Sequence, residues 1–105
     1  MVNGLKLRIK YSVGKWIMWG YTGRVLYPFM LFRAAKEDIP DWLFRHEFEH
    51  VYQVREHGWW KFHLMYLWEL IRYGYRDNFF EIVARSVENQ PLTKRERELI
   101  NRRTK

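Results

Sequence analysis

The most informative stretch of this chain is residues 41–57, DWLFRHEFEHVYQVREH. Its spacing predicts one helix, with Asp38 or Asp41 as the cap at its start and Gly58 just beyond its end. At 100° per residue, four polar side chains share a stripe about 60° wide: His46, His50, Gln53 and His57. A solvated helix face usually carries Lys and Arg instead. We therefore expect a helix that is buried on most sides and turns this stripe toward a cleft.

Within this helix, HEFEH at residues 46–50 is an HExxH pattern. Residues four apart lie on one helix face, with Cβ atoms about 5–6 Å apart, so His46 and His50 are able to bind one zinc ion at about 2.0–2.1 Å. Glu47 lies about 100° further round the helix, where it is better placed to take a proton from a water that the metal activates. Chance produces such a pattern in roughly one of a hundred chains this rich in His and Glu, so its context has to decide.

A catalytic zinc site takes three protein ligands and keeps one position open. His57 is about 10 Å further along the helix than His50, which is too far to share the ion. The HExxHxxGxxH class is excluded because Gln53 and Glu56 stand at its glycine and last histidine positions. The third ligand is then a carboxylate from this set: Glu49, Glu56, Glu69, Glu81 and Glu88. Spacing alone leaves Glu81 either a ligand or part of a solvated stripe.

Composition limits the classes of protein that the chain can belong to. A chain of 105 residues, 48% of them hydrophobic, predicts one domain with a modest core. It has no cysteine, so any metal must be held by His and carboxylates. The longest apolar run, Val25–Phe32, is too short for a transmembrane helix, and the charged N-terminal residues lack the apolar core of a signal peptide. A cytoplasmic protein is the default expectation.

The net charge of +7 is uneven, since the last fourteen residues carry +4. The capping box Thr93–Glu96 predicts that this basic segment is a terminal helix, residues 93–105, exposed to solvent. Nucleic-acid binding is disfavoured because no base-reading motif is present. The six Trp, seven Tyr and seven Phe fill a small core and leave some aromatic rings exposed. Exposed aromatics and the basic tail would suit docking to a larger protein assembly.

The segment before the first helix, residues 5–33, predicts two or three antiparallel strands. Leu5–Ser12 alternates apolar and polar residues, as a half-buried strand does. Glycines between residues 20 and 23 indicate a turn, and Arg24–Arg33 continues as strand. Pro28 cannot donate to a ladder, which indicates an edge strand. Such an edge strand would hold an extended peptide by main-chain pairing.

Two further helices are expected after Gly58. The helix at residues 59–73 is apolar nearly all round, so most of its surface has to be covered by protein or membrane. Its charged residues group on one narrow side: Lys61, Glu69 and Arg72. His63 falls on the apolar side, as a core histidine would. The next helix, residues 79–89, carries Glu81 and ends before Pro91.

Three features together resemble a known family. HEFEHVYQ, the aromatic-rich helix after Gly58, and an Asn-x-x-Glu-x-x-Ala segment at Asn78–Ala84 are similar to the small gluzincin-type zinc peptidase domains, the mini-zincins of bacteria and phages. The resemblance covers residues 39–89. It implies one zinc ion on His46, His50 and Glu81, with Glu47 as the general base. Arg85 departs from it, because larger gluzincins carry an aspartate there that orients a ligand histidine.

The sequence thus predicts an α+β, zincin-like single domain over residues 1–105 that hydrolyses peptide bonds of a peptide or protein substrate. Tyr75, Tyr73 or His63 could donate to the oxyanion, and the sequence does not rank them. The alternative is a structural or assembly module that zinc merely staples, for example in a phage particle or a secretion machine. Glu47 favours the enzyme, because a structural site has no need of an acid beside its first ligand.

Overall fold

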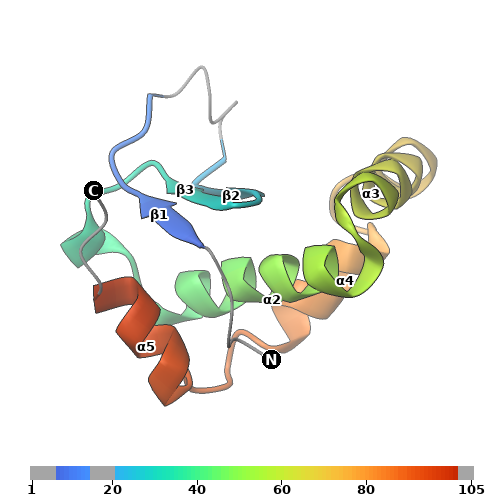
Figure 1. Cartoon of the computed structure of the whole chain (residues 1–105). Helices are drawn as coiled ribbons and strands as arrows, with labels where there is room; N and C mark the ends of the chain where they lie inside the picture. Colours follow the sequence, from blue (N-terminus) through green and yellow to red (C-terminus); the bar gives the residue numbers. More distant parts are fainter. Residues whose placement is uncertain (1–6, 15–20, 102–105) are drawn as a thin grey trace.

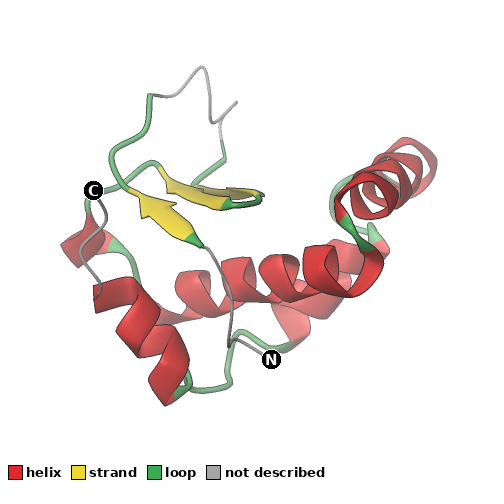
Figure 2. Ribbon diagram, in the orientation of Figure 1, coloured by secondary structure: helices red, strands yellow, loops and turns green. Residues whose placement is uncertain are grey.

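The computed structural model describes residues 7–14 and 21–101, in which a small three-stranded sheet is followed by helices (Figure 1 and Figure 2). The predicted α+β class is confirmed. The elements, in chain order, are β1 (Arg8–Lys10), β2 (Gly23–Leu26), β3 (Phe29–Phe32), the 3-10 helix η1 (Lys36–Asp38), α2 (Asp41–His57), α3 (Trp59–Tyr73), α4 (Phe79–Ser86) and α5 (Lys94–Asn101). In Figure 1 the sheet lies over one part of α2, and α3 lies near the other end of this helix.

The sheet is mixed, with strand order β1-β3-β2. Val25 on β2 faces Met30 on β3 in an antiparallel pair, whereas Ile9 on β1 faces Met30 in a parallel pair. The prediction of antiparallel strands alone is therefore wrong for β1. Alternation in the sequence indicates which side chains are buried, and Leu7 and Ile9 are indeed buried. Alternation carries no information on strand direction. The connection between β1 and β2 is long enough to allow either a parallel or an antiparallel pairing.

The sequence suggested that Pro28 lies within an edge strand, and this prediction is wrong. Tyr27 and Pro28, joined by a cis peptide bond, form the two-residue turn between β2 and β3. Proline costs no ladder hydrogen bond in such a turn, so β3 is free to be the central strand. The carbonyl of Pro28 accepts a hydrogen bond from the Arg8 backbone N–H at 2.8 Å. Of the predicted glycine turn, residues 20–23, only Gly20 lies outside those described; residues 21 and 22 are irregular, and Gly23 begins β2.

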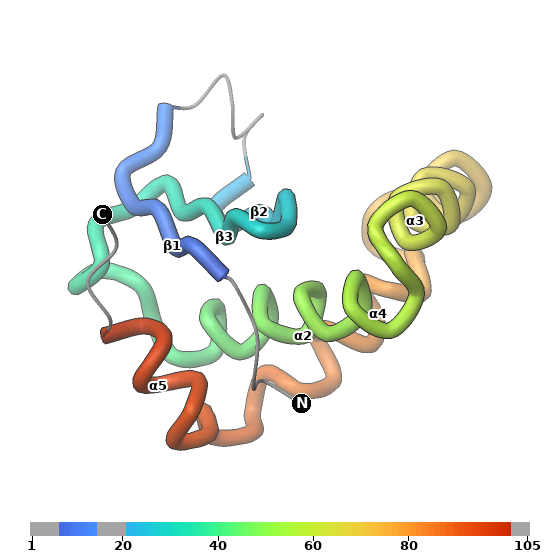
Figure 3. Tube along the Cα trace, viewed as in Figure 1, coloured from blue at the N-terminus to red at the C-terminus, as the bar shows by residue number. Residues whose placement is uncertain are grey.

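The main core lies between the sheet and α2. Met30 and Phe32 from β3 and Phe48 and Val51 from α2 are fully buried there. The bounds of α2 and α3 are as predicted, and Gly58 between them has a φ of 87°, which favours glycine. The predicted cap of α2 is wrong: Pro40 occupies the cap position, and no side chain bonds to the helix start. Figure 3 follows the chain from the sheet through α2.

α4 is shorter than predicted, and α5 begins one residue later than predicted. α4 ends at Ser86 rather than at residue 89, and α5 runs from Lys94 to Asn101, with residues 102–105 outside the description. The capping box is confirmed, because the Glu96 N–H donates to Thr93 Oγ1 and the Thr93 N–H donates to Glu96 Oε1. The two donor–acceptor distances are 3.1 and 2.8 Å.

α5 packs on the protein and is not a solvated tail helix as predicted. Glu96 is fully buried and pairs with Arg45 of α2 at 2.6 Å, and it also accepts a hydrogen bond from Tyr52. Leu99 is buried in the main core. This network holds α5 against a face of α2 that differs from the face of His46. None of the described helices is long and apolar enough to cross a membrane.

Candidate metal centre

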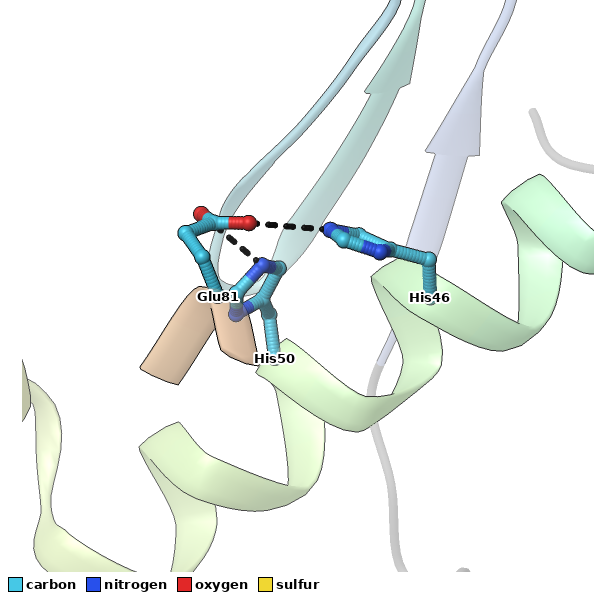
Figure 4. A group of neighbouring side chains, drawn as sticks. All are labelled: His46, His50 and Glu81. Atoms are coloured by element: carbon cyan, nitrogen blue, oxygen red, sulfur yellow. Dashed lines mark hydrogen bonds and ion pairs between the residues drawn. The ribbon is translucent and has the colours of Figure 1, made fainter. Parts of the chain in front are cut away.

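Two imidazoles and one carboxylate meet in the interior, as Figure 4 shows. His46 and His50 come from α2, and Glu81 comes from the first turn of α4. One ligand atom from each lies within 4.8 Å of the others, and all three side chains are buried. These residues therefore form a group that is able to hold a metal ion.

Local features of α4 carry Glu81 to this position. Asn78 caps the helix, because its side-chain oxygen accepts from the Phe80 N–H at 2.9 Å. The amide of Asn78 also donates to the carbonyl of Tyr66 at 3.1 Å, which ties the start of α4 to α3. Ala84 is fully buried, and its small side chain allows α4 to approach its neighbours closely. The cap and this close packing set the depth at which Glu81 reaches the two histidines.

In this structure Glu81 bridges the two imidazoles through their Nε2 atoms. Its Oε1 lies 3.0 Å from Nε2 of His46, and its Oε2 lies 3.2 Å from Nε2 of His50. Oε2 also accepts a hydrogen bond of 2.6 Å from the Tyr66 hydroxyl. Both rings thus direct Nε2 to the same carboxylate, so these three groups are close enough together to share one metal ion.

The other ring nitrogens are also bonded. Nδ1 of His46 lies 2.7 Å from Oε2 of Glu88, and Nδ1 of His50 lies 2.9 Å from Oε1 of Gln53. Gln53 is itself held by the carbonyl of Phe80, to which it donates at 3.1 Å. An acceptor at Nδ1 keeps the proton there and leaves the lone pair of Nε2 for a metal.

Glu88 was one of the candidate ligands in the sequence, and its contact with His46, 2.7 Å from Oε2 to Nδ1, was not foreseen. Its carboxylate is therefore placed to orient the His46 ring. Arg85 is exposed and donates to the carbonyl of Arg76. The available signal was the spacing, because Glu88 lies seven residues after Glu81 and so near the same side of a continued helix.

Glu47 lies in the interior next to β2. Its side chain is buried, and burial raises the pKa of Glu47 although the imidazoles of His50 and His46 oppose the shift. A Cβ atom at Gly23 would stand only 2.9 Å from Oε2 of Glu47. Gly23 thus lets the strand approach the carboxylate closely.

A cavity of about 360 Å³ opens beside the cluster. Glu47, His50 and Glu81 line one part of it, and β2 lines another along its whole length, Gly23–Leu26. α3 supplies an apolar part with these residues: Phe62, Leu67 and Leu70. The cavity therefore brings together Glu47, which is not one of the candidate metal ligands, two residues that are (His50 and Glu81), and strand β2.

The geometry of the cavity separates the remaining candidates for the oxyanion donor and for the third metal ligand. Tyr75 and His63 line the cavity, whereas Tyr73 is half exposed and does not. Burial raises the pKa of Tyr75, so its hydroxyl keeps its proton at neutral pH. The other carboxylates and His57 stay outside the cluster: Glu49 pairs with Arg45, Glu56 is exposed, Glu69 accepts from the Phe79 N–H, and His57 packs on the Phe80 ring.

The pKa values of the three cluster residues are shifted in the directions that favour their charged forms. Burial alone would raise the pKa of Glu81, but hydrogen bonds from His46 and His50 outweigh burial and hold this pKa well below its usual range. Burial alone would lower the pKa of His50, but the hydrogen bond to Glu81 and the charge of Glu47 raise it to about 9. The pKa of His46 is raised in the same way. At neutral pH a metal ion must therefore displace a proton.

Comparison of the chain with protein-family models, with curated proteins and with solved structures finds no match in any of the three. The likeness to the small gluzincin-type domains accordingly rests on the motifs alone, and what it implies about activity stays a proposal. The geometry of the cluster stands independently of that likeness, because it follows from contacts within this chain.

Replacing Glu88 by Ala is expected to lower zinc affinity by about 10- to 100-fold, the usual cost of removing the carboxylate behind a ligand histidine. The physical reason is the 2.7 Å contact with Nδ1 of His46, which fixes the tautomer of the ring. Competition with a chromophoric chelator measures the affinity. The control is Glu98→Ala, which removes an exposed carboxylate of α5. Equal affinity for both variants would show that Glu88 does not orient His46.

Zinc affinity is expected to rise with pH up to about 9. The pKa of His50 is raised from about 6.5 in the unfolded chain to about 9 in the folded one, so protonated His50 stabilises the metal-free fold. This contribution is complete below pH 6.5 and is lost as the pH rises through about 9. Zinc has to displace the same proton, so affinity gains up to about tenfold per pH unit for each proton released. Melting temperatures with zinc and with chelator should therefore move apart from pH 6.5 to 9. A constant difference would contradict this coupling.

Proposed function

We propose that this protein is a zinc-dependent metallopeptidase of the gluzincin type. The observation that carries the proposal is the cavity in which Glu47 lies with His50 and Glu81. An acid beside the metal ligands, but not bridging them, is what hydrolysis requires and what a purely structural site lacks. His46 completes the ligand group behind this cavity.

The donor set fits zinc. Two imidazole nitrogens and one carboxylate match the three-ligand pattern of catalytic zinc sites, and the chain has no thiolate to complete a closed structural site. Both imidazoles present Nε2 and have an acceptor at Nδ1, as ligand histidines do. When bound, zinc supplies Lewis acidity, which polarises a carbonyl group and lowers the pKa of water to about 7.

The side chains around the cavity have distinct proposed roles in this reaction. Glu47 accepts a proton from the attacking water and passes it to the leaving amine, and its raised pKa suits both transfers. Tyr75 keeps its proton and lines the same cavity, so among the candidates it is the best placed to donate to the developing oxyanion. Tyr66 holds Glu81 through its hydroxyl.

The shape of the cavity supports an extended peptide as the substrate. The whole of β2, Gly23–Leu26, forms one side, along which a peptide would lie extended. The apolar part from Phe62, Leu67 and Leu70 would receive a large apolar side chain next to the scissile bond. We therefore expect cleavage beside Leu, Phe or similar residues.

The direct test is incubation of the zinc-loaded wild type with a peptide library and with an unfolded protein, followed by mass spectrometry of the new termini. The proposal predicts cleavage that stops with chelator, returns with zinc and favours large apolar residues at one side of the cut. Stoichiometric zinc binding with no cleavage of either substrate would reject the peptidase and favour a zinc-stapled structural module.

A further inference from the structure

The outward side of α3 carries large apolar side chains in water. Five of them are between 50% and 73% exposed: Trp60, Leu64, Leu67, Trp68 and Ile71. At 100° per residue they occupy one arc about 100° wide, and we call them the α3 stripe. They form a continuous surface along the helix rather than scattered exposed residues. Soluble domains rarely leave such a contiguous apolar patch uncovered.

The other side of α3 accounts for its packing on the protein. Phe62 is the one buried residue of this helix, and it packs with Val54 and Phe80 in a second, smaller core. Tyr66 and Met65 are partly buried against the same core. The described part of the chain thus covers one side of the helix and leaves the stripe exposed to solvent. The stripe is therefore a candidate docking surface.

The charges beside the stripe are all positive. Lys61 and Arg72 follow the arc on one side, about 20–40° beyond Trp68. The guanidinium of Arg72 lies over the rings of Trp68 and Tyr73, at 5.5 and 5.7 Å from their centroids. Glu69, the one acidic residue of α3, is partly buried, lies further from the stripe than either basic residue, and accepts a hydrogen bond from the Phe79 N–H. The charged residues nearest to the stripe are therefore the cationic Lys61 and Arg72.

We propose that the α3 stripe docks onto an anionic lipid bilayer, with α3 lying in the plane of the interface. A helix with Trp and Leu on its outer side and Lys and Arg beside them has the composition of interfacial helices. Its fifteen residues extend over roughly 22 Å, which is short of the hydrocarbon core of about 30 Å. The packed side of Phe62 also has to stay on the protein, so only the outer side enters the interface.

Charge selects the bilayer over a second copy of the chain. The protein carries +7, and a symmetric contact between two stripes would bring Lys61 and Arg72 of each copy close to one another. An anionic surface instead attracts these groups. Leu67 belongs both to the stripe and to the lining of the cavity, so the docked bilayer would lie beside the cavity mouth. Docking itself does not depend on the proposed peptidase activity.

Flotation with lipid vesicles tests the proposal on the full chain. We expect the wild type to float with equimolar phosphatidylcholine and phosphatidylglycerol vesicles and to stay behind with phosphatidylcholine alone. Ile71→Glu should weaken binding more than tenfold. The matched control is Trp42→Glu, which makes the same charge change at a half-exposed apolar residue of α2 and should retain most of the binding. Equal losses in both variants would overturn the assignment to the stripe.

The basic residues are tested separately. Lys61→Gln and Arg72→Gln should each lower affinity for the anionic vesicles by about fivefold, the usual contribution of one basic residue near a charged surface. Lys94→Gln and Arg97→Gln remove the same charge from α5 and should lower the affinity for the vesicles less. A larger loss from the α5 pair would show that the basic C-terminal segment, and not α3, meets the lipid.

A labelled protein keeps the test independent of destabilised variants. The chain has no cysteine, so Ile71→Cys and Glu98→Cys each accept one environment-sensitive fluorophore. Anionic vesicles should shift the emission of the label at position 71 to the blue and leave that at position 98 unchanged. Two results would overturn the proposal: no shift at position 71, or a concentration-dependent dimer that Ile71→Glu dissociates in the absence of any vesicle binding.

Discussion

Zinc-dependent peptide cleavage is expected to fall by about 10²- to 10⁴-fold in the Glu47→Gln variant, the range typical for loss of a general base. The amide keeps the size of the side chain and its fit beside Gly23, where the space for the carboxylate is tight. Because Glu47 does not belong to the ligand group, zinc stoichiometry should stay at one per chain, and affinity should change little.

The matched control for this variant is Glu56→Gln, an exposed residue of the same helix, which should cleave at the wild-type rate. Turnover of a cleaved peptide, zinc content and melting temperature are measured on the same preparations. Loss of zinc together with activity would mean that Glu47 acts through the metal ligands. Retention of full activity would exclude it as the base.

The Glu81→Ala variant is expected to lose more than about 100-fold in zinc affinity, beyond the loss usual for a residue behind a ligand. Glu81 supplies the only negative charge of the ligand group, and its carboxylate contacts both imidazoles. Its removal also frees the Tyr66 hydroxyl. The remaining two histidines would hold zinc only weakly. Equilibrium competition with a chelator gives the affinity.

Because Glu81 also contacts His46, His50 and Tyr66 in the interior, Glu81→Gln serves as a second variant that preserves the shape of the side chain. It should still bind zinc far more weakly than the wild type, since a neutral amide is a poor zinc ligand. Glu56→Ala removes an exposed carboxylate and should bind as the wild type does. Wild-type affinity in a folded Glu81 variant would remove this residue from the ligand set.

Local sequence patterns predicted the helices well because local rules determine them. The periodic pattern of residues 41–57 and the position of Gly58 gave both ends of α2, and the capping box gave the start of α5 within one residue. The burial of α5 could not be predicted in this way. Glu96 reads as a capping residue in the sequence, and only the packing of α5 on α2 brings it to Arg45.

In the candidate site, too, the contacts within one helix could be predicted from the sequence, and the contacts between helices could not. His46 and His50 share a helix face, so their convergence follows from spacing alone. Glu81 comes from another helix, and only the motif resemblance singled it out before the structure placed it. The contact of Glu88 with His46 was missed because Glu88 lies beyond the end of α4, in a turn whose path toward α2 is not determined by local sequence patterns. The parallel pairing of β1 was missed for a similar reason, since alternation is the same in both strand directions.

The central claim is that His46, His50 and Glu81 hold one zinc ion, and a crystal structure of zinc-loaded protein tests it most directly. Data collected on both sides of the zinc absorption edge locate the metal without assumptions about its ligands. The account predicts one anomalous peak per chain, about 2.0–2.2 Å from Nε2 of both histidines and from a carboxylate oxygen of Glu81. A peak elsewhere, or no peak while Glu81 still bridges the two imidazoles, would contradict it.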